Sequence, residues 1–276
     1  MTGPRKFVDL MFKTTGKFAN WELAKEIRVG DYGTVDSKTG TFEKDGNIYD
    51  ENLIPNKTDK DDIVPGEPLS YWKVSTETAH ECNFSGGPEV NVAGIADVAL
   101  AGTWKFDEKR GAVLLMHLPQ LWQIPNMKLL DRLVDVPEVK GKYIVSDAYA
   151  CPASSLYISG KSSEEVTITL HAEVDPIVAG VAAAVPIGGG GNVKGGWYTP
   201  LFTLKKRRWY AKWRGVPQAP IDPNEDKYED IDVPWGPLDS DGEDALDPGG
   251  EDEEYSDIEK MPEDLVRRSP RTATVG

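Results

Sequence analysis

The chain has 276 residues, with 46 acidic and 31 basic side chains, a formal net charge of −15 and a hydrophobic content of 39%. This length and content allow one large or two small domains with a substantial core. They exclude a disulfide scaffold, because Cys82 and Cys151 are the only cysteines, and a spanning helix, because no apolar run reaches ~18 to 20 residues. We predict two free buried thiols and, because the N-terminus lacks a signal-peptide pattern, an unsecreted chain.

The net charge lies almost entirely in the C-terminal part of the chain. Residues 217–276 hold 19 acidic and 5 basic residues, whereas residues 1–216 hold 27 acidic and 26 basic residues. The C-terminal segment is also rich in Pro and Gly and poor in apolar residues, so it cannot bury enough surface to offset its ordering entropy. We therefore predict a folded domain over 1–216 and a mostly disordered acidic tail over 217–276.

The N-terminal part predicts short elements separated by turns. Residues 5–13 are basic and apolar, and they predict either a small amphipathic helix or a first strand. Residues 21–27 are a second helix candidate, with Asn20 as its N-cap. Asp45 and Gly46 lie between two short β segments and predict the turn of a hairpin.

The middle of the chain predicts strands around one short helix. Asn126 can cap a helix over 127–134, whose leucines fall on one stripe. The segments with strand character are 69–76, 90–100, 112–118 and 142–145. Helical pieces mixed with many strands, without a regular alternation of strand and helix, predict an α+β fold. We expect a largely antiparallel twisted sheet with a few short helices.

The clearest strand pattern runs from 166 to 174, where apolar and polar residues alternate. Such a period of two indicates a strand with one apolar and one polar face. The apolar face consists of Val166, Ile168, Leu170, Ala172 and Val174. An apolar run at 177–185 and the glycines at 188–191 follow, and we interpret these glycines as a flexible hairpin tip more readily than as a phosphate cradle.

Basic and aromatic residues gather directly after the next strand candidate, 197–204. We name the basic members the basic collar: Lys205, Lys206, Arg207, Arg208, Lys212 and Arg214. Trp209, Tyr210 and Trp213 are interleaved with them. Such a group suits nucleic acid, but the chain as a whole is acidic, and we predict no nucleic-acid partner. An anionic lipid surface suits basic residues beside Trp and Tyr better. A solubilising edge strand is the remaining interpretation.

Sequence patterns of catalytic sites are weak. His80 and Cys82 could ligate a metal, but no second pair of ligands lies at a suitable spacing. No nucleophile elbow and no phosphate-binding loop sequence occurs. No pair of carboxylates stands out from the acidic background. We therefore predict that the protein is not an enzyme and uses no cofactor or metal. An enzyme remains the third hypothesis, after the two binding functions described below.

The chain resembles the gasdermin-like proteins of filamentous fungi, which act in heterokaryon incompatibility and regulated cell death. Residues 142–147 look like the strand that follows a short Leu-rich helix in gasdermin pore-forming domains. Residues 162–173 look like the start of their second membrane hairpin, and 198–204 with the basic run look like its return. Residues 79–105 lie where the first hairpin is expected. The likeness spans residues 5–216.

The resemblance implies a lipid-binding protein that oligomerises into a β-barrel pore. It would be cytoplasmic at rest and act at the plasma membrane. Its partners would be anionic membrane phospholipids, further copies of the chain, and a protease or a related partner protein as trigger. The basic collar, with Arg5 and Lys6, would contact the headgroups, and the apolar face of 166–174 would face lipid. A non-inserting β-rich module that binds lipid or a partner protein is the other open hypothesis.

The length of the strand candidate agrees with this implication. A membrane strand needs ~9 to 11 residues with one lipid face and one water face. Residues 165–174 meet that requirement, whereas 177–186 are apolar on both faces and do not. In a soluble state such strands must hide their apolar faces, because exposed apolar patches promote aggregation.

The acidic tail has two interpretations. The large helical repressor of animal gasdermins is missing from the sequence, which leaves the tail as the candidate for control. Its charge opposes that of the basic collar, and it begins three residues after Arg214, so tethering gives it a high local concentration there. The tail could restrain the collar until a protease cuts its Pro-rich part at 217–237. A purely solubilising tail is the alternative.

Overall fold

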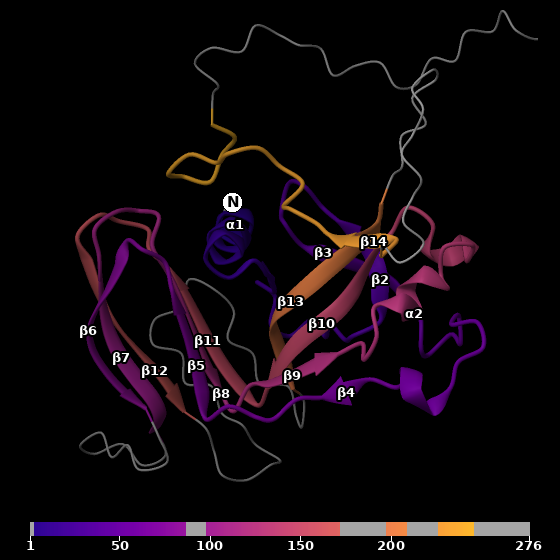
Figure 1. Cartoon of the computed structure of the whole chain (residues 1–276). Coiled ribbons are helices and arrows are strands. Elements are labelled where there is room, and N and C mark those ends of the chain that lie inside the picture. The colour runs from indigo at the N-terminus through magenta and orange to yellow at the C-terminus, as the bar shows by residue number, and fades with distance from the viewer. Residues whose placement is uncertain (1–2, 87–97, 172–196, 209–225, 246–276) are drawn as a thin grey trace, which may run out of the picture. The chain divides into compact units, whose positions relative to one another are not determined.

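The computed structural model of the protein describes residues 3–86, 98–171, 197–208 and 226–245 (Figure 1). These residues form mostly antiparallel sheets with a few short helices, which confirms the predicted α+β class. The strands divide among three sheets, where the sequence predicted one. No helix in the described ranges combines the length and the hydropathy that crossing a membrane requires.

The N-terminal segment, for which the sequence allowed a helix or a strand, forms helix α1 (Gly3–Thr15). Its buried apolar side chains are Phe7, Val8, Leu10 and Met11. Their spacing places them along one side of the helix, so the helix rather than the strand can bury them together. The helix ends at Gly16, which takes a φ of +68° and donates its N–H to the Phe12 carbonyl oxygen at 2.7 Å.

The largest sheet has eight strands and is centred on β10. Its strands are β1 (Phe18–Ala19), β2 (Asp31–Val35), β3 (Phe42–Asn47), β4 (Val64–Pro65), β9 (Gln120–Gln123), β10 (Tyr143–Cys151), β13 (Tyr198–Arg207) and β14 (Tyr228–Asp230). β10 pairs antiparallel with β13, β2 and β9, and β13 also pairs with β1 and β14. Figure 1 shows β13 and β10 side by side, with β14 at one end of β13.

A second sheet, in the order β11, β8, β5, separates two hydrophobic cores. Its strands are β5 (Tyr71–Ser75), β8 (Ala112–His117) and β11 (Ala153–Ile158). Successive side chains of a strand point to opposite faces. Leu114 and Met116 pack in the core that contains the apolar side of α1, whereas Val113 and Leu115 pack in the other core. A strand between two cores must be apolar at every position, which explains the continuous apolar run that begins at residue 112.

The third sheet, in the order β12, β7, β6, carries the predicted membrane strand. Its strands are β6 (Ala79–Gly86), β7 (Val98–Phe106) and β12 (Glu164–His171). Ile168 and Leu170 are fully buried in one core with Trp104 and Phe106, and Val166 is partly buried against it. The alternation is thus confirmed as a strand with a buried apolar face as far as residue 171. Ala172, Val174 and the segment 177–191 lie outside the described residues.

The remaining helices are short, and one predicted helix is absent. They are η1 (Asp59–Asp61), α2 (Lys128–Asp131) and η2 (Pro137–Val139). α2 lies inside the predicted range 127–134, and the Lys128 N–H donates to Asn126 Oδ1 at 2.9 Å. Residues 21–27 form turns. Seven residues are too few to nucleate a helix without strong tertiary support. The Asn20 amide donates to the Lys25 carbonyl oxygen at 2.9 Å, so Asn20 does not act as an N-cap.

The predicted hairpin turn at Asp45 and Gly46 is wrong, because both residues lie inside β3. The β2–β3 turn occupies residues 36–41, where Gly40 has a φ of +75° and donates its N–H to the Asp36 carbonyl oxygen at 2.7 Å. Gly46 serves a different purpose, since a Cβ at this position would collide with the Glu51 carboxylate. A glycine required for close packing therefore looked like a glycine required for a turn.

Described structure continues past the predicted domain boundary at 216. The compact unit extends to Asp244. We name residues 226–244 the cover segment. It adds β14 to the large sheet and buries Tyr228 and Leu238. The prediction of a disordered tail is wrong for this segment, because apolar residues spaced between its acidic residues anchor it. The rest of the predicted tail lies outside the described residues, apart from Ala245.

Candidate functional site

The cover segment lies against the basic collar where β14 pairs with the end of β13. Lys205 is opposite Asp230, and Lys206 is opposite Glu229. The Lys205 ammonium is 2.8 Å from Asp230 Oδ1, and Arg208 Nε is 3.2 Å from Glu229 Oε2. Two cations of the collar therefore face carboxylates of the acidic segment that follows the collar in the sequence.

The other described members of the collar are held within the large sheet and beside α2. Lys206 Nζ lies 4.9 Å from the centroid of the Tyr143 ring, which is within cation–π range. Arg207 donates to the Val134 carbonyl oxygen at 3.0 Å. Lys212 and Arg214 lie outside the described residues. The structure thus places four of the six collar residues, and all four lie at one end of β13.

Lys128 extends the collar in space, although it is distant in sequence. Its ammonium is 2.9 Å from Asp226 Oδ1. The hydrogen bond from Lys128 lowers the pKa of Asp226 below its ordinary value, and the same contact raises the pKa of Lys128. Lys128 therefore lies beside the basic collar and contacts the same cover segment. Sequence reasoning missed it because only the fold brings α2 beside the cover segment.

A second basic group, which we name the helix cluster, consists of Arg5, Lys6, Lys109 and Arg110. The first two lie on α1, and the other two lie between β7 and β8. Arg5 and Lys6 were predicted to join the collar at a lipid surface. In the structure they belong to this separate cluster, which a different part of the cover segment contacts. The signal for Lys109 and Arg110 was present in the sequence as adjacent bases in a turn, but nothing there linked them to α1.

The far end of the cover segment closes over the helix cluster. Arg5 forms an ion pair with Asp244, and its guanidinium carbon is 5.6 Å from the centroid of the Trp235 ring. Lys109 Nζ is 3.3 Å from Asp241 Oδ1. Arg110 donates to a backbone carbonyl oxygen of the same segment, that of Leu238, at 2.8 Å. One acidic segment therefore covers both basic groups.

Lys6 is the most buried cation of the helix cluster, with 7% of its surface exposed. Burial lowers the pKa of Lys6, and the neighbouring charges of Arg110 and Lys109 lower it further. Asp241 and Asp239 act in the opposite direction and only partly compensate. An ammonium in this position is electrostatically unfavourable in the covered state.

The turn at the end of the cover segment is shaped by Asp239. Its Oδ1 accepts hydrogen bonds from the N–H groups of Asp241 at 2.9 Å and Glu243 at 3.0 Å. The backbone hydrogen bond from Glu243 is the main reason that the pKa of Asp239 is lowered. Trp235 donates its indole N–H to Asp9 of α1 at 3.3 Å. These contacts hold the acidic turn against the helix cluster.

The polar face of the third sheet includes a threonine pair between its strands. Thr103 and Thr167 share a hydrogen bond of 3.0 Å across β7 and β12. The apolar residues predicted to face lipid, Val166, Ile168 and Leu170, instead contact the core between the second and third sheets. In the described state these side chains are therefore not available to a membrane.

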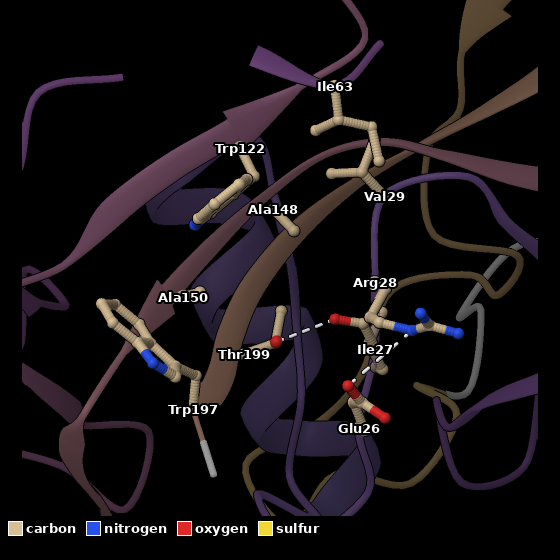
Figure 2. A pocket seen from close by; sticks show the side chains of 10 residues that line it. All are labelled: Glu26, Ile27, Arg28, Val29, Ile63, Trp122, Ala148, Ala150, Trp197 and Thr199. Atoms are coloured by element: carbon tan, nitrogen blue, oxygen red, sulfur yellow. Dashed lines mark hydrogen bonds and ion pairs between the residues drawn. The ribbon is translucent and has the colours of Figure 1, made fainter. Parts of the chain in front are cut away.

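A separate pocket of about 440 Å³ opens at the other end of β13 (Figure 2). Its lining includes Trp122 of β9, Ala148 and Ala150 of β10, Thr199 of β13, and Trp197 directly before β13. Residues 26–29 and Ile63 form the rest of the lining. The pocket is distinct from the covered basic groups, and no sequence pattern pointed to it.

The thiol prediction is confirmed only in part, and the metal prediction stays a prediction. Within the described ranges, no group of three or more potential ligands is arranged to hold a metal ion. His80 pairs with Asp107 at 2.6 Å on the surface. Both cysteines are free, as predicted, but only Cys151 is buried, and Cys82 is exposed on β6. Burial raises the pKa of the Cys151 thiol, so this cysteine is a structural residue.

No protein-family model matches the chain, and a search of curated proteins also finds no match. The resemblance to gasdermin-like proteins therefore stays a prediction. The functional argument depends on the geometry of the basic groups, their acidic cover and the third sheet.

Proposed function

We propose that this chain is a gasdermin-like, membrane-active protein that binds anionic phospholipids through the basic collar and the helix cluster. At rest it is cytoplasmic, with the cover segment on both basic groups. After release it binds the plasma membrane, assembles with further copies and forms a β-barrel pore in regulated cell death. The trigger is a protease or a related partner protein that removes or displaces the cover segment.

The observation that carries this proposal is the pairing between the cover segment and the basic groups. Carboxylates of one short segment meet Lys205, Arg208, Lys128, Arg5 and Lys109. Headgroup phosphates offer these cations the same kind of partner as carboxylates do. Near an anionic leaflet each basic residue contributes about 1 kcal/mol of attraction. These cations can therefore exchange the carboxylates of the cover segment for the phosphates of lipid headgroups.

The burial of the third sheet supports the resting half of the proposal. A strand that later faces lipid must first hide its apolar side chains, and Ile168 and Leu170 are hidden in this way. Insertion would require β7, with Trp104, and β12 to leave the core that they share with the second sheet. Burying one large apolar side chain contributes about 1.5 to 3 kcal/mol, so lipid contact and strand pairing in the oligomer would have to compensate for several of them.

The same burial also favours a second candidate function, the non-inserting lipid- or protein-binding module. Of the side chains that would face lipid, Ile168 and Leu170 are already buried inside the chain. In this alternative the basic groups bind an anionic surface after release, and the third sheet stays in place. The two candidates differ in one measurable respect, which is whether vesicle contents leak.

The test uses the full chain and vesicles of phosphatidylcholine with and without phosphatidylserine. The releasing variant combines Glu229→Lys with Asp230→Lys, which replaces attraction by repulsion at the collar. Its control combines Glu22→Lys with Glu67→Lys, two exposed sites away from the basic groups that change the net charge equally. Co-sedimentation measures binding, and release of a trapped dye measures permeabilisation.

We expect the releasing variant to bind acidic vesicles more tightly than the control and to release dye. Binding without dye release would favour the non-inserting module. Equal binding by both variants would show that the cover segment does not restrain the collar, and the solubilising interpretation of the tail would remain. Adding Lys205→Gln and Arg208→Gln to the releasing variant should abolish its gain in binding.

A further inference from the structure

The pocket in Figure 2 has an apolar interior between two tryptophans. Trp122 of β9 lies opposite Ala148 of β10 in the antiparallel register. Ala150 follows two positions later, on the same strand. The two small side chains leave open space between Trp122 and Trp197, and half of the Trp197 surface is exposed (51%). The result is a slot with an alanine floor and an indole at either end.

The hydroxyl group that lines the pocket already has a hydrogen-bond partner. The Thr199 hydroxyl donates to the Ile27 carbonyl oxygen at 2.8 Å, so its hydrogen is not available to a ligand. The interior therefore offers apolar contact and indole faces, with little scope for directional hydrogen bonds. A ligand that needs several hydrogen bonds would lose more by leaving water than it would gain in this pocket.

The charged residues that line the pocket are Glu26 and Arg28. The Arg28 guanidinium is hydrogen-bonded to Asp50, and this bond is the main cause of the raised pKa of Arg28. Glu26 lies 3.7 Å from Arg28 Nε, too far for a hydrogen bond, and its side chain is 70% exposed. Asp50 therefore neutralises Arg28 from outside the pocket lining, and Glu26 is the more loosely held carboxylate and the one that lines the pocket.

We propose that this pocket binds an organic cation that consists of an alkylated ammonium on an apolar body. The ammonium would lie against the faces of Trp122 and Trp197, with Glu26 as its counter-charge. A quaternary ammonium has no N–H group to donate and is attracted to indole faces, so it fits a pocket that supplies these faces and few hydrogen-bond acceptors. The proposal is independent of the proposed function, because it requires neither release of the cover segment nor a membrane.

The test is an NMR titration of the full chain that follows the indole N–H signals of the tryptophans. Trp122→Phe and Trp197→Phe variants assign the two relevant signals. The probe is benzyltrimethylammonium, and its uncharged control is the carbon isostere neopentylbenzene. We expect the signals of Trp122 and Trp197 to shift with the cation, and we expect the cation to bind about 3- to 30-fold more tightly than the isostere. Equal affinity for the cation and the isostere would show a site that does not recognise charge and would overturn the proposal. The absence of any shift in the Trp122 and Trp197 signals would also overturn it.

Two further variants separate the aromatic and the electrostatic parts. Trp197→Ala should weaken binding of the cation about tenfold, and Trp197→Tyr should restore part of it by returning an aromatic face. Glu26→Gln should weaken binding about threefold, because the carboxylate is exposed and screened. Glu67→Gln removes an exposed carboxylate outside the pocket and should leave affinity unchanged. If Glu26→Gln and Glu67→Gln behave alike, Glu26 is not the counter-charge.

An alkylated ammonium could come from a phosphatidylcholine headgroup or from a free metabolite. Vesicles of pure phosphatidylcholine carry no net charge, so the basic groups add little attraction to them. If such vesicles bind the wild-type chain and Trp197→Ala removes the binding, the source is lipid. If the soluble cation binds and these vesicles do not, the source is a free small molecule.

Discussion

The third sheet and the cover segment are held in place by opposite kinds of interaction. The third sheet buries Trp104, Ile168 and Leu170 in a hydrophobic core. The cover segment buries Tyr228 and Leu238, pairs β14 with β13 and adds partly exposed ion pairs such as those of Lys205 and Arg208. Apolar burial is not screened by salt, whereas exposed ion pairs are weak and screened. The cover segment is therefore the part of the molecule that can leave first.

This difference orders the events in the proposed function. Removing the cover segment exposes apolar residues at the edge of a core, whereas moving the third sheet takes apart the core that contains Trp104. A change of charge or ionic strength should act on the first and leave the second almost untouched. The predictions below test that separation, beginning with the largest expected effect.

Placing a charge in the third sheet should cause the largest loss of stability. Leu170→Asp puts an unpaired carboxylate where the wild-type side chain is fully buried. We expect the free energy of unfolding to fall by about 3 kcal/mol or more. Thr167→Asp, on the exposed face of the same strand, should change it by only about 0.5 kcal/mol. Denaturant unfolding of both variants measures the difference.

Because of this expected loss of stability, a membrane test of β12 needs a folding assay beside it. Ile168→Asp and Leu170→Asp look like probes of a lipid face, but both sites lie in the core of the described state. Loss of dye release by either variant would therefore carry no meaning without a folding assay. A folded Leu170→Asp protein that still releases dye would remove β12 from the membrane-spanning strands.

Reversing charges on the cover segment should have a smaller and more local effect. Glu229→Lys with Asp230→Lys breaks two partly exposed ion pairs, for which we expect a loss of about 1 kcal/mol. Hydrogen exchange should accelerate at the Ile231 amide, which donates to the Leu204 carbonyl oxygen at 3.3 Å. The amides of the third sheet should not change. Acceleration in both regions would contradict the separation between them.

The sequence predicted the elements with a strong local period and missed those that depend on distant contacts. The alternation at 166–170 and the continuous apolar run of β8 each indicated a strand correctly. The three-sheet arrangement could not be predicted, because a run of apolar residues does not say which two cores it separates. Gly46 was misread because a glycine that avoids the Glu51 side chain looks, in sequence, like a glycine in a turn.

The candidate site was predicted only in part for the same reason. The density of cations around Lys205 was visible in the sequence, and so was their opposition to the acidic tail. Lys128, Lys109 and Arg110 belong to the surface only because the fold brings α2 and the β7–β8 turn to the cover segment. The order of the cover segment was missed because net charge was counted over the whole tail, which concealed the anchoring role of Tyr228 and Leu238.

Acid should release the cover segment before it affects the third sheet. The pKa values of Asp226 and Asp239 are lowered, so their contribution to the covered state is complete above the ordinary Asp value of 3.8 and is lost as the pH falls through their lowered values. Below pH 3.8 we expect faster hydrogen exchange at Ile231 while the third sheet stays protected. Simultaneous loss of protection in both regions would indicate global acid unfolding instead.

The smallest expected effect, a stabilisation, distinguishes a functional lysine from a structural one. Lys6 is buried beside Arg110 and Lys109, and its lowered pKa shows that the charged form is disfavoured in the covered state. Lys6→Met keeps the length of the side chain and removes the charge. We expect Tm to rise by about 1 to 3 °C. Lys13→Met is the matched control with the opposite sign, because Lys13 pairs with the buried Asp9 at 2.8 Å.

The pH dependence tests the cause of this stabilisation. Between the lowered pKa of Lys6 in the folded protein and its ordinary value of 10.5, the unfolded chain binds more protons, so the stability of the wild-type protein rises with pH. The advantage of Lys6→Met should therefore be constant at neutral pH and should shrink as the pH rises toward 10.5. The same variant should weaken vesicle binding in the background of Glu229→Lys with Asp230→Lys. A lysine that lowers stability at rest and strengthens membrane binding after release is retained for binding, whereas a fall in Tm for Lys6→Met would assign Lys6 to the fold.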